Sequence, residues 1–166
     1  MSEKDLIVKE KVEHSGLLDF GGFYSFAHSW FKEEGYGVDE IKYAEKSDGA
    51  KRSIDIEWKI TKRLSDYFKI EHKLKMEIKD LTEVEVETDG KKKKMNQGKI
   101  TVEISGALIR DPDSKWDKAP FYRFMRDLYN KYIIPSRIDG VMFKVSDDVK
   151  KVKEEMKAFF EMTGRR

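Results

Sequence analysis

The sequence contains no cysteine, and this absence excludes disulfides, thiolate metal sites and cysteine nucleophiles. No run approaches the ~20 consecutive apolar residues that a membrane-spanning helix needs. The formal net charge is only +2, so no overall field draws the protein to nucleic acid or to a membrane. Because no apolar run follows the charged first residues, we expect no signal peptide and a cytoplasmic location.

Known catalytic signatures are also missing. There is no phosphate-binding glycine loop, no HExxH and no GxSxG. The histidines His14, His28 and His72 are far apart and have no spacing typical of metal ligands. We therefore expect no metal and no cofactor, and a binding protein rather than an enzyme.

Charge is what the chain has in excess. Of its 166 residues 40% are charged, against about 25% in an average globular domain. The 39% of hydrophobic residues is enough for a core, and the length predicts a single domain over residues 1–166. Abundant Lys and Glu with little Asn and Gln is typical of hyperthermophile proteins.

The clearest pattern lies in residues 53–79, where apolar and charged residues alternate over two strand lengths. Such alternation predicts an antiparallel hairpin with one face against a core and the other in water. The residues expected on the core face are Ile54, Ile56, Trp58, Ile60, Phe68, Ile70, His72, Leu74, Met76 and Ile78.

Charges on the other face of this hairpin indicate a register. A three-residue loop at 64–66 places Lys59 opposite Glu71 and Glu57 opposite Lys73, so that opposite charges meet. The same register places Trp58 opposite His72 on the apolar side. The strand at 55–59 also loosely resembles the alternating acid and base strands of triphosphate tunnel enzymes. Because its charges find partners, we favour solvated salt bridges over that enzyme.

The apolar periodicity predicts an α+β fold. We expect a curved antiparallel sheet of about five to six strands, packed on one face by an N-terminal helix and two C-terminal helices. The predicted elements are strands at 6–12 and 38–46, the hairpin at 53–79 with a continuation that bends near Leu81, a loop at 88–98, strands at 99–110 and 141–145, and helices at 17–32, from Pro120 to Pro135, and at 147–163.

This order of elements resembles the helix-grip fold of the START and Bet v 1 family, which also begins with a strand and helix and ends with a long helix. The chain departs from that family by having one helix after its first strand and an extra helix at Pro120. Residues 132–134, 137–138, 157–160 and 164–166 are also similar to the end of small archaeal proteins. That second resemblance implies no activity.

Two interpretations of the apolar face remain open. In the first, a small apolar or amphipathic ligand lies between the sheet and the C-terminal helix, with His72 as its polar anchor. In the second, the same side chains form a solid core, His72 is a hydrogen-bonded core residue, and the protein is an interaction or assembly module. The candidate ligand-binding residues are Phe23, Trp30, Trp58, His72, Met76 and Phe160.

The strongest basic run is Lys91, Lys92, Lys93 and Lys94. Lysines attract phosphate groups without sequence preference, so this run is a candidate phosphate-binding site in a loop. No aromatic residue interrupts it, which removes the stacking platform that single-stranded nucleic acid uses. We therefore interpret it as a solvated loop and do not expect nucleic acid to be the partner.

Overall fold

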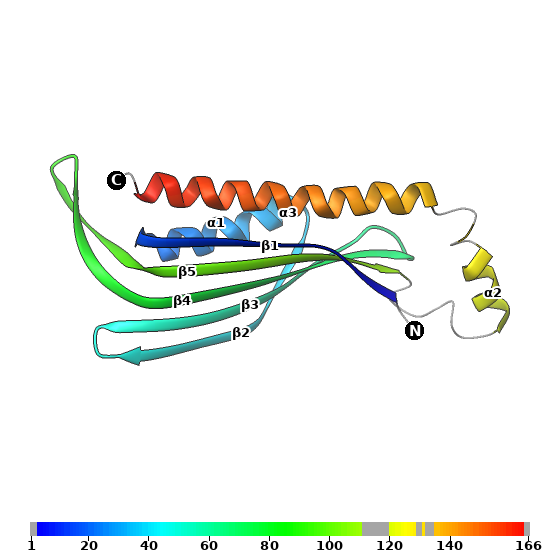
Figure 1. The fold of residues 1–166 in the computed structure, drawn as a ribbon, viewed down its shortest axis with the longest axis horizontal. Helices are drawn as coiled ribbons and strands as arrows, with labels where there is room; N and C mark the ends of the chain where they lie inside the picture. Colours follow the sequence, from blue (N-terminus) through cyan, green and yellow to red (C-terminus); the bar gives the residue numbers. More distant parts are fainter. Residues whose placement is uncertain (1–2, 111–119, 129–130, 132–134, 165–166) are drawn as a thin grey trace.

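The computed structural model describes residues 3–110, 120–128, 131 and 135–164. This part of the chain forms five strands and three helices, which agrees with the predicted α+β class (Figure 1). Their bounds are β1 Glu3–Leu18, α1 Phe20–Glu33, β2 Gly37–Asp48, β3 Lys51–Arg63, β4 Phe68–Thr88, β5 Lys91–Arg110, α2 Pro120–Leu128 and α3 Pro135–Gly164.

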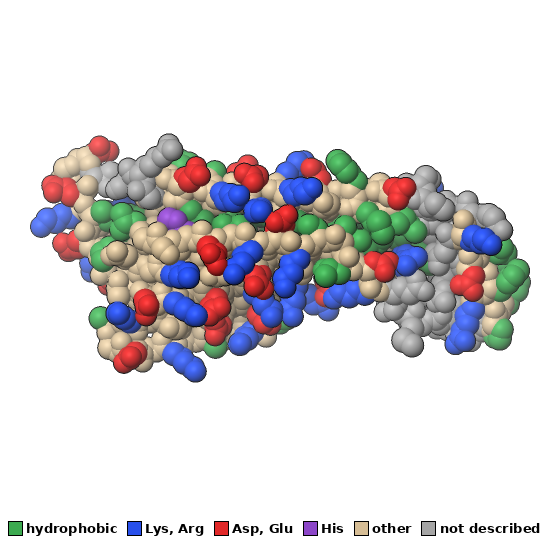
Figure 2. Space-filling model, viewed as in Figure 1, with side chains coloured by type: hydrophobic (Ala, Val, Ile, Leu, Met, Phe, Trp, Pro, Cys, Tyr) green, Lys and Arg blue, Asp and Glu red, His purple; other side chains and the backbone are tan. Residues whose placement is uncertain are grey.

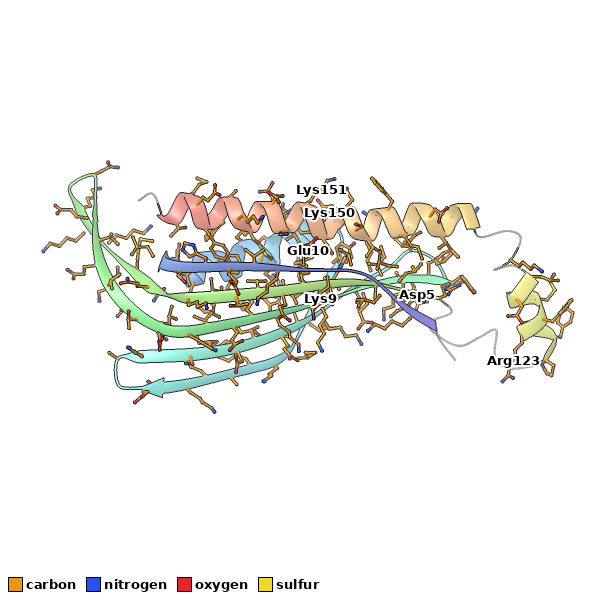
Figure 3. All side chains as sticks on the ribbon, in the orientation of Figure 1. Asp5, Lys9, Glu10, Arg123, Lys150 and Lys151 are labelled. Carbon is orange, nitrogen blue, oxygen red and sulfur yellow. The ribbon has the colours of Figure 1, made fainter. Side chains whose placement is uncertain are left out.

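All neighbouring strands of the sheet are antiparallel, in the order β1-β5-β4-β3-β2. The first strand therefore lies beside the last, with Val12 opposite Val102. A charged pair also holds β1 to α3, because Lys153 Nζ lies 2.9 Å from Glu10 Oε2. Glu10 is labelled in Figure 3, on β1 beside the long helix.

One face of the sheet is covered by α1 and α3, and the other carries charged side chains (Figures 1 and 2). The core-facing parity predicted for β3 and β4 is confirmed, because all ten of those residues are buried. The covering layer begins at Asp19, whose side chain accepts a hydrogen bond from the Gly22 N–H and so caps α1. Phe23, Ala27 and Phe31 then face the sheet from α1.

The last helix is longer than the predicted 147–163, because α3 begins at Pro135. The strand predicted at 141–145 is wrong, since those residues belong to this helix. Val145 and Val149 are four residues apart and extend one helical stripe. Pro135 is compatible with the first helical position, where its fixed φ and missing N–H cost little.

The register of β3 against β4 also differs from the predicted one. Lys59 lies opposite Lys73, and Glu57 lies opposite Lys75. The prediction that Lys59 faces Glu71 is therefore wrong by two residues.

Turn geometry explains this register. The Ser65 hydroxyl accepts hydrogen bonds from the backbone N–H groups of Tyr67 and Phe68, at 3.2 and 3.1 Å. This turn is longer than the predicted three-residue loop. Lys59 Nζ still reaches Glu71 Oε1 diagonally, at 3.8 Å. Ion pairs near the surface, such as this one, contribute only about 0.2–1 kcal/mol each, too little to choose the register alone.

The hairpin of β4 and β5 is much longer than predicted. Residues 88–98 were expected to form a loop, but β4 continues to Thr88 and β5 begins at Lys91. Only a two-residue turn, in which Asp89 and Gly90 both have positive φ, separates the strands. Positive φ at both central residues suits a tight hairpin turn, so the strands pair almost to the tip.

The predicted bend near Leu81 is confirmed. The β4–β5 ladder shifts between Lys79 and Thr82, and Asp80 adopts a φ of 53°. Gly98 permits the close crossing, because a Cβ there would lie 2.9 Å from the Lys79 carbonyl oxygen. Beyond this bend the hairpin curls toward the C-terminal end of α3 (Figure 1).

The short helix α2 lies beyond the end of the sheet, so α1 and α3 supply the covering layer (Figure 1). Its apolar stripe is exposed and includes Met125. Tyr132, which falls within the predicted helix from Pro120 to Pro135, lies outside the described residues. None of the described helices is long and apolar enough to cross a membrane.

Candidate functional site

The structure brings the predicted ligand-binding residues together on the covered face of the sheet. Four of them are buried in one continuous hydrophobic core, His72 is buried as well, and Trp30 packs against the core partly buried. Phe23 stacks on Phe160 with ring centroids 4.7 Å apart, and the Tyr24 ring meets Trp58 edge-on at 5.1 Å. Side chains in such contact fill the space between sheet and helices.

His72 lies on β4 within this core and is fully buried. It faces Ile60 on β3, whereas Trp58 lies opposite Leu74, so the predicted Trp58–His72 pair is wrong. The His72 ring meets the Tyr36 ring edge-on, with centroids 4.9 Å apart. The imidazole fits at this position because the neighbouring strand β5 leaves room for it.

The room comes from Gly106 on β5. A Cβ at this position would lie 3.0 Å from His72 Nδ1 and 2.6 Å from Val145 Cγ1 on α3. Gly106 therefore lets α3 and the imidazole approach the same point of the sheet. The sequence alone does not link this glycine to His72.

Burial lowers the pKa of His72 to about 4. The Asp148 carboxylate and the Ser105 backbone act in the opposite direction, but their effect is smaller. Neither ring nitrogen has a hydrogen bond of good geometry to a described residue. His72 is therefore neutral at neutral pH, and the expectation of a hydrogen-bonded core histidine is wrong within the described residues.

A polar network lies next to His72. The Tyr36 hydroxyl, just after α1, donates to Asp148 Oδ2 on α3 at 2.6 Å, and both residues are buried. Lys144 Nζ lies 3.3 Å from the same oxygen. Burial, followed by the hydrogen bond to Asp148, raises the pKa of the Tyr36 phenol, so Tyr36 stays protonated and donates.

Sequence reasoning missed Tyr36 and Asp148. The available signal was the position of Asp148, three residues after Val145 and four before Val152, within the apolar stripe of the last helix. An acid on the buried face of a helix needs a partner. The sequence alone does not show which residue on another element supplies it.

A groove opens beside this network, where Lys144 forms part of its wall. Its volume is about 350 Å³, its lining is mostly apolar, and it lies between the β3–β4 turn and the first turns of α3. Gly140 contributes no side chain, and a Cβ built there meets no atom within 4 Å. The groove is lined by Leu64, Ser65, Phe68, Arg137, Gly140, Val141 and Lys144.

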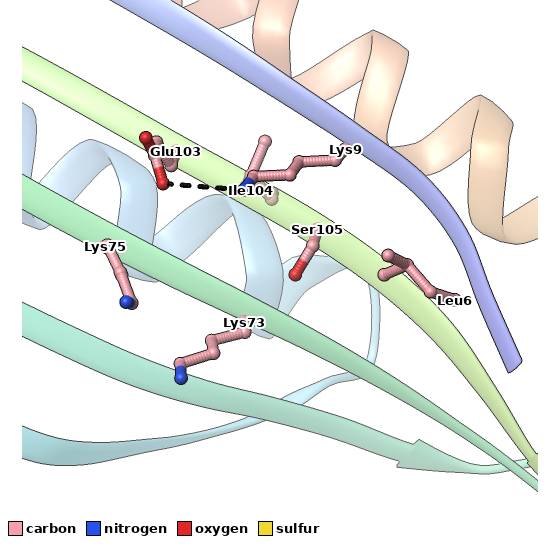
Figure 4. Close-up of a pocket in the computed structure, with 7 residues that line it drawn as sticks. All are labelled: Leu6, Lys9, Lys73, Lys75, Glu103, Ile104 and Ser105. Atoms are coloured by element: carbon pink, nitrogen blue, oxygen red, sulfur yellow. Dashed lines mark ion pairs between the residues drawn. The ribbon is translucent and has the colours of Figure 1, made fainter. Parts of the chain in front are cut away.

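The charged face of the sheet carries smaller hollows. One of about 220 Å³ contains Lys73 and Lys75, and there Lys9 Nζ lies 4.0 Å from Glu103 Oε2 (Figure 4). On the neighbouring strands, Lys75 Nζ lies 3.6 Å from Glu57 Oε1. These charges are largely exposed and interspersed in sign, which is typical of a solvated surface.

The four lysines at 91–94 lie on strand β5, so their expected place in a loop is wrong. All four are exposed. Lys92 faces Glu87 and Lys94 faces Glu85 on β4. The acids offset part of the positive charge, so this hairpin tip is a mixed surface and a weaker candidate for phosphate binding.

No cluster of three His, Asp or Glu side chains suited to a metal ion occurs among the described residues. The groove at the start of α3 is therefore the strongest candidate site, with the Tyr36–Asp148–Lys144 network beside it. Comparisons with family models, with curated proteins and with solved structures found no match to this chain.

Proposed function

We propose that the protein binds a small amphipathic anion in the groove between the end of the sheet and the first turns of α3. The observation that carries this proposal is a mostly apolar groove that has Arg137 and Lys144 in its lining. An apolar body would contact Leu64, Phe68 and Val141. A carboxylate or phosphate head would pair with the two cations, whose charge complements it.

The dimensions of the groove support a small ligand. Its volume of about 350 Å³ lies near the lower end of known ligand pockets, which is about 300 Å³. The location agrees with the sequence-based hypothesis of a ligand held between the sheet and the C-terminal helix. The proposed binding residues differ from the predicted ones. They lie at one end of the sheet and of α3, because core side chains fill the space between the sheet and the helices elsewhere.

Lys144 is suited to exchange partners. It pairs with Asp148 in the structure, but the Asp148 carboxylate also accepts a hydrogen bond from the Tyr36 hydroxyl. If Lys144 turns toward a bound anion, Asp148 therefore keeps one partner. Ligand binding then does not leave a buried carboxylate alone, which would be costly.

We also propose a helix-grip relationship, with which two features of the topology are consistent. β1 pairs with the last strand, and α3 crosses the covered face of the same sheet. Both features follow the element order that the sequence shares with the START and Bet v 1 family. A ligand between sheet and last helix is consistent with that arrangement.

The test is isothermal titration calorimetry with decanoate and with nonyltrimethylammonium, which have alkyl chains of equal length and head groups of opposite charge. We expect decanoate to bind more tightly because of the two cations. In the Gly140→Leu variant the new side chain should fill the groove and weaken decanoate binding at least about tenfold. Gly140→Ala is the matched control, with a similar gain in helix propensity and little loss of space.

Arg137→Gln removes one of the two charges and leaves the apolar lining unchanged. It should weaken decanoate binding about tenfold and have little effect on binding of the cationic probe. The proposal fails if wild-type protein binds neither probe. It also fails if Gly140→Leu binds decanoate as well as Gly140→Ala does.

A further inference from the structure

Exposed apolar side chains concentrate at the end of the molecule that carries α2. Figure 2 shows hydrophobic atoms along the outer margin of this end, where Figure 1 places α2. The most exposed are Phe143 on α3, at 71%, and Phe121 on α2, at 65%. The exposed apolar residues of α2, the first half of α3 and the β3–β4 turn are Leu64, Phe121, Phe124, Met125, Leu128 and Phe143.

The stripe on α2 has regular helical spacing. Phe121, Phe124, Met125 and Leu128 follow an i, i+3, i+4, i+7 pattern, so they share one face of the helix. Arg123 lies off this face, and Figure 3 shows it on α2 at the far end of the molecule. α2 is thus amphipathic with its apolar side open to solvent.

Positive charge accompanies the stripe. The sequence from 120 to 131 has three basic residues, Arg123, Arg126 and Lys131, and one acid, Asp127. A short helix with Phe and Leu on one face and a net positive charge on the rest is the pattern of helices that lie in the surface of an anionic membrane. A protein partner would need a matching groove, but a lipid surface needs only this separation of apolar and basic groups.

We propose that α2 docks this end of the protein onto an anionic lipid bilayer, with Phe124, Met125 and Leu128 inserted at the level of the head groups. The basic residues of the same helix pair with lipid phosphates. No helix in the described part of the chain spans a membrane, so the attachment is peripheral. This inference does not depend on a ligand in the groove.

The experiment is co-sedimentation of the full chain with vesicles of phosphatidylcholine alone, or of phosphatidylcholine and phosphatidylglycerol in equal parts. We expect binding to the anionic vesicles, weaker binding to the neutral ones, and loss of the difference at high salt. Phe124→Ser combined with Met125→Ser should reduce binding to anionic vesicles at least about tenfold.

The matched control changes two exposed apolar residues elsewhere, Ile41→Ser with Met162→Ser, which are 54% and 61% exposed. It should bind like the wild type. The proposal is overturned if anionic vesicles are not bound, if both vesicles are bound equally, or if the α2 variant matches the control.

Analytical ultracentrifugation without vesicles tests whether the apolar stripe of α2 instead contacts a second copy of the protein. If the wild type is a dimer and the α2 variant a monomer, the stripe is an interface between two copies and the lipid proposal is overturned. The Gly140→Leu variant should bind vesicles normally, so a failure of the groove hypothesis is distinguishable from a failure of this one.

Discussion

The two halves of α3 have the same backbone and different surroundings. The part from Val145 onward, called the second half here, is packed against the sheet and α1 through a stripe of buried residues, which are Val145, Val149, Val152, Met156 and Phe160. In the first half Ile138, Val141 and Met142 are only partly buried and touch a small cluster around Phe68. Phe143 is 71% exposed.

This difference shows that helix continuity and core coverage are separate properties. The main core ends near Val145, while the helix continues beyond it to Pro135. The uncovered half keeps an apolar groove and two cations that a solid core would not tolerate. Stability should therefore depend on the second half, and any ligand should depend on the first.

The largest expected contrast comes from two phenylalanines. Phe160→Ala removes a buried ring that stacks on Phe23 and His14, and should lower the free energy of unfolding by about 3–5 kcal/mol. Phe143→Ala should change it by less than about 0.5 kcal/mol. Urea unfolding followed by circular dichroism measures both. Equal losses would show that both halves are covered in solution.

The pH dependence of stability should reflect the protonation of His72, which lies near Val145 at the boundary between the two halves of α3. Its pKa is about 4 in the folded protein and ordinarily 6.5, so the unfolded chain binds a proton more readily between these values. Stability should fall by about 3 kcal/mol as the pH drops from above 6.5 to 4.

In the His72→Leu variant this contribution should disappear from urea titrations over the same pH range. Asp148 and Lys144 lie near the imidazole and stay in place in the variant, so they form the common background. If the wild type and variant lose stability in parallel, His72 is not the group responsible.

Gly106→Ala tests how closely α3 packs against β5 at Val145, where the packed half of the helix begins. The added methyl group would meet Val145 Cγ1 at 2.6 Å, and a β-branched side chain has little freedom to move. We expect a loss of about 1–3 kcal/mol in the free energy of unfolding. Adding Val145→Ala should recover part of it, and strictly additive losses would contradict the proposed contact.

The smallest effect is expected in the open half. Gly140→Ala adds a methyl group where no atom lies within 4 Å, so helix propensity should raise the free energy of unfolding by about 0.5–1 kcal/mol. Thermal unfolding detects such a change. No gain would mean that this half of α3 is not helical in solution, and a loss would mean that something covers it.

The sequence predicted the covered face of the sheet, because burial of Ile54, Trp58 and Ile70 depends only on alternation along each strand. It did not predict the strand register. That depends on a turn in which Ser65 accepts two backbone hydrogen bonds, and the competing charge pairs are individually weak. The local sequence pattern thus predicts which face of each strand is buried, whereas the geometry of the turn determines the register between strands.

The candidate site was harder to predict than the fold. The aromatic residues selected from the sequence mostly fill the core, since spacing alone does not distinguish a lined pocket from a packed one. The groove instead depends on where α3 passes the β3–β4 turn, and the Tyr36–Asp148 bond joins residues 112 positions apart. Such contacts follow from the tertiary arrangement.

The pairing of β1 with β5 sets an order of events during synthesis. Gly16 cannot meet Gly98, nor Glu3 meet Arg110, until nearly the whole sheet has been translated. At a translation rate of about 5–20 residues per second, β1 waits roughly 5–20 s without its neighbour. The charged residues Lys9, Lys11 and Glu13 at alternate positions of this strand oppose premature pairing with other nascent chains.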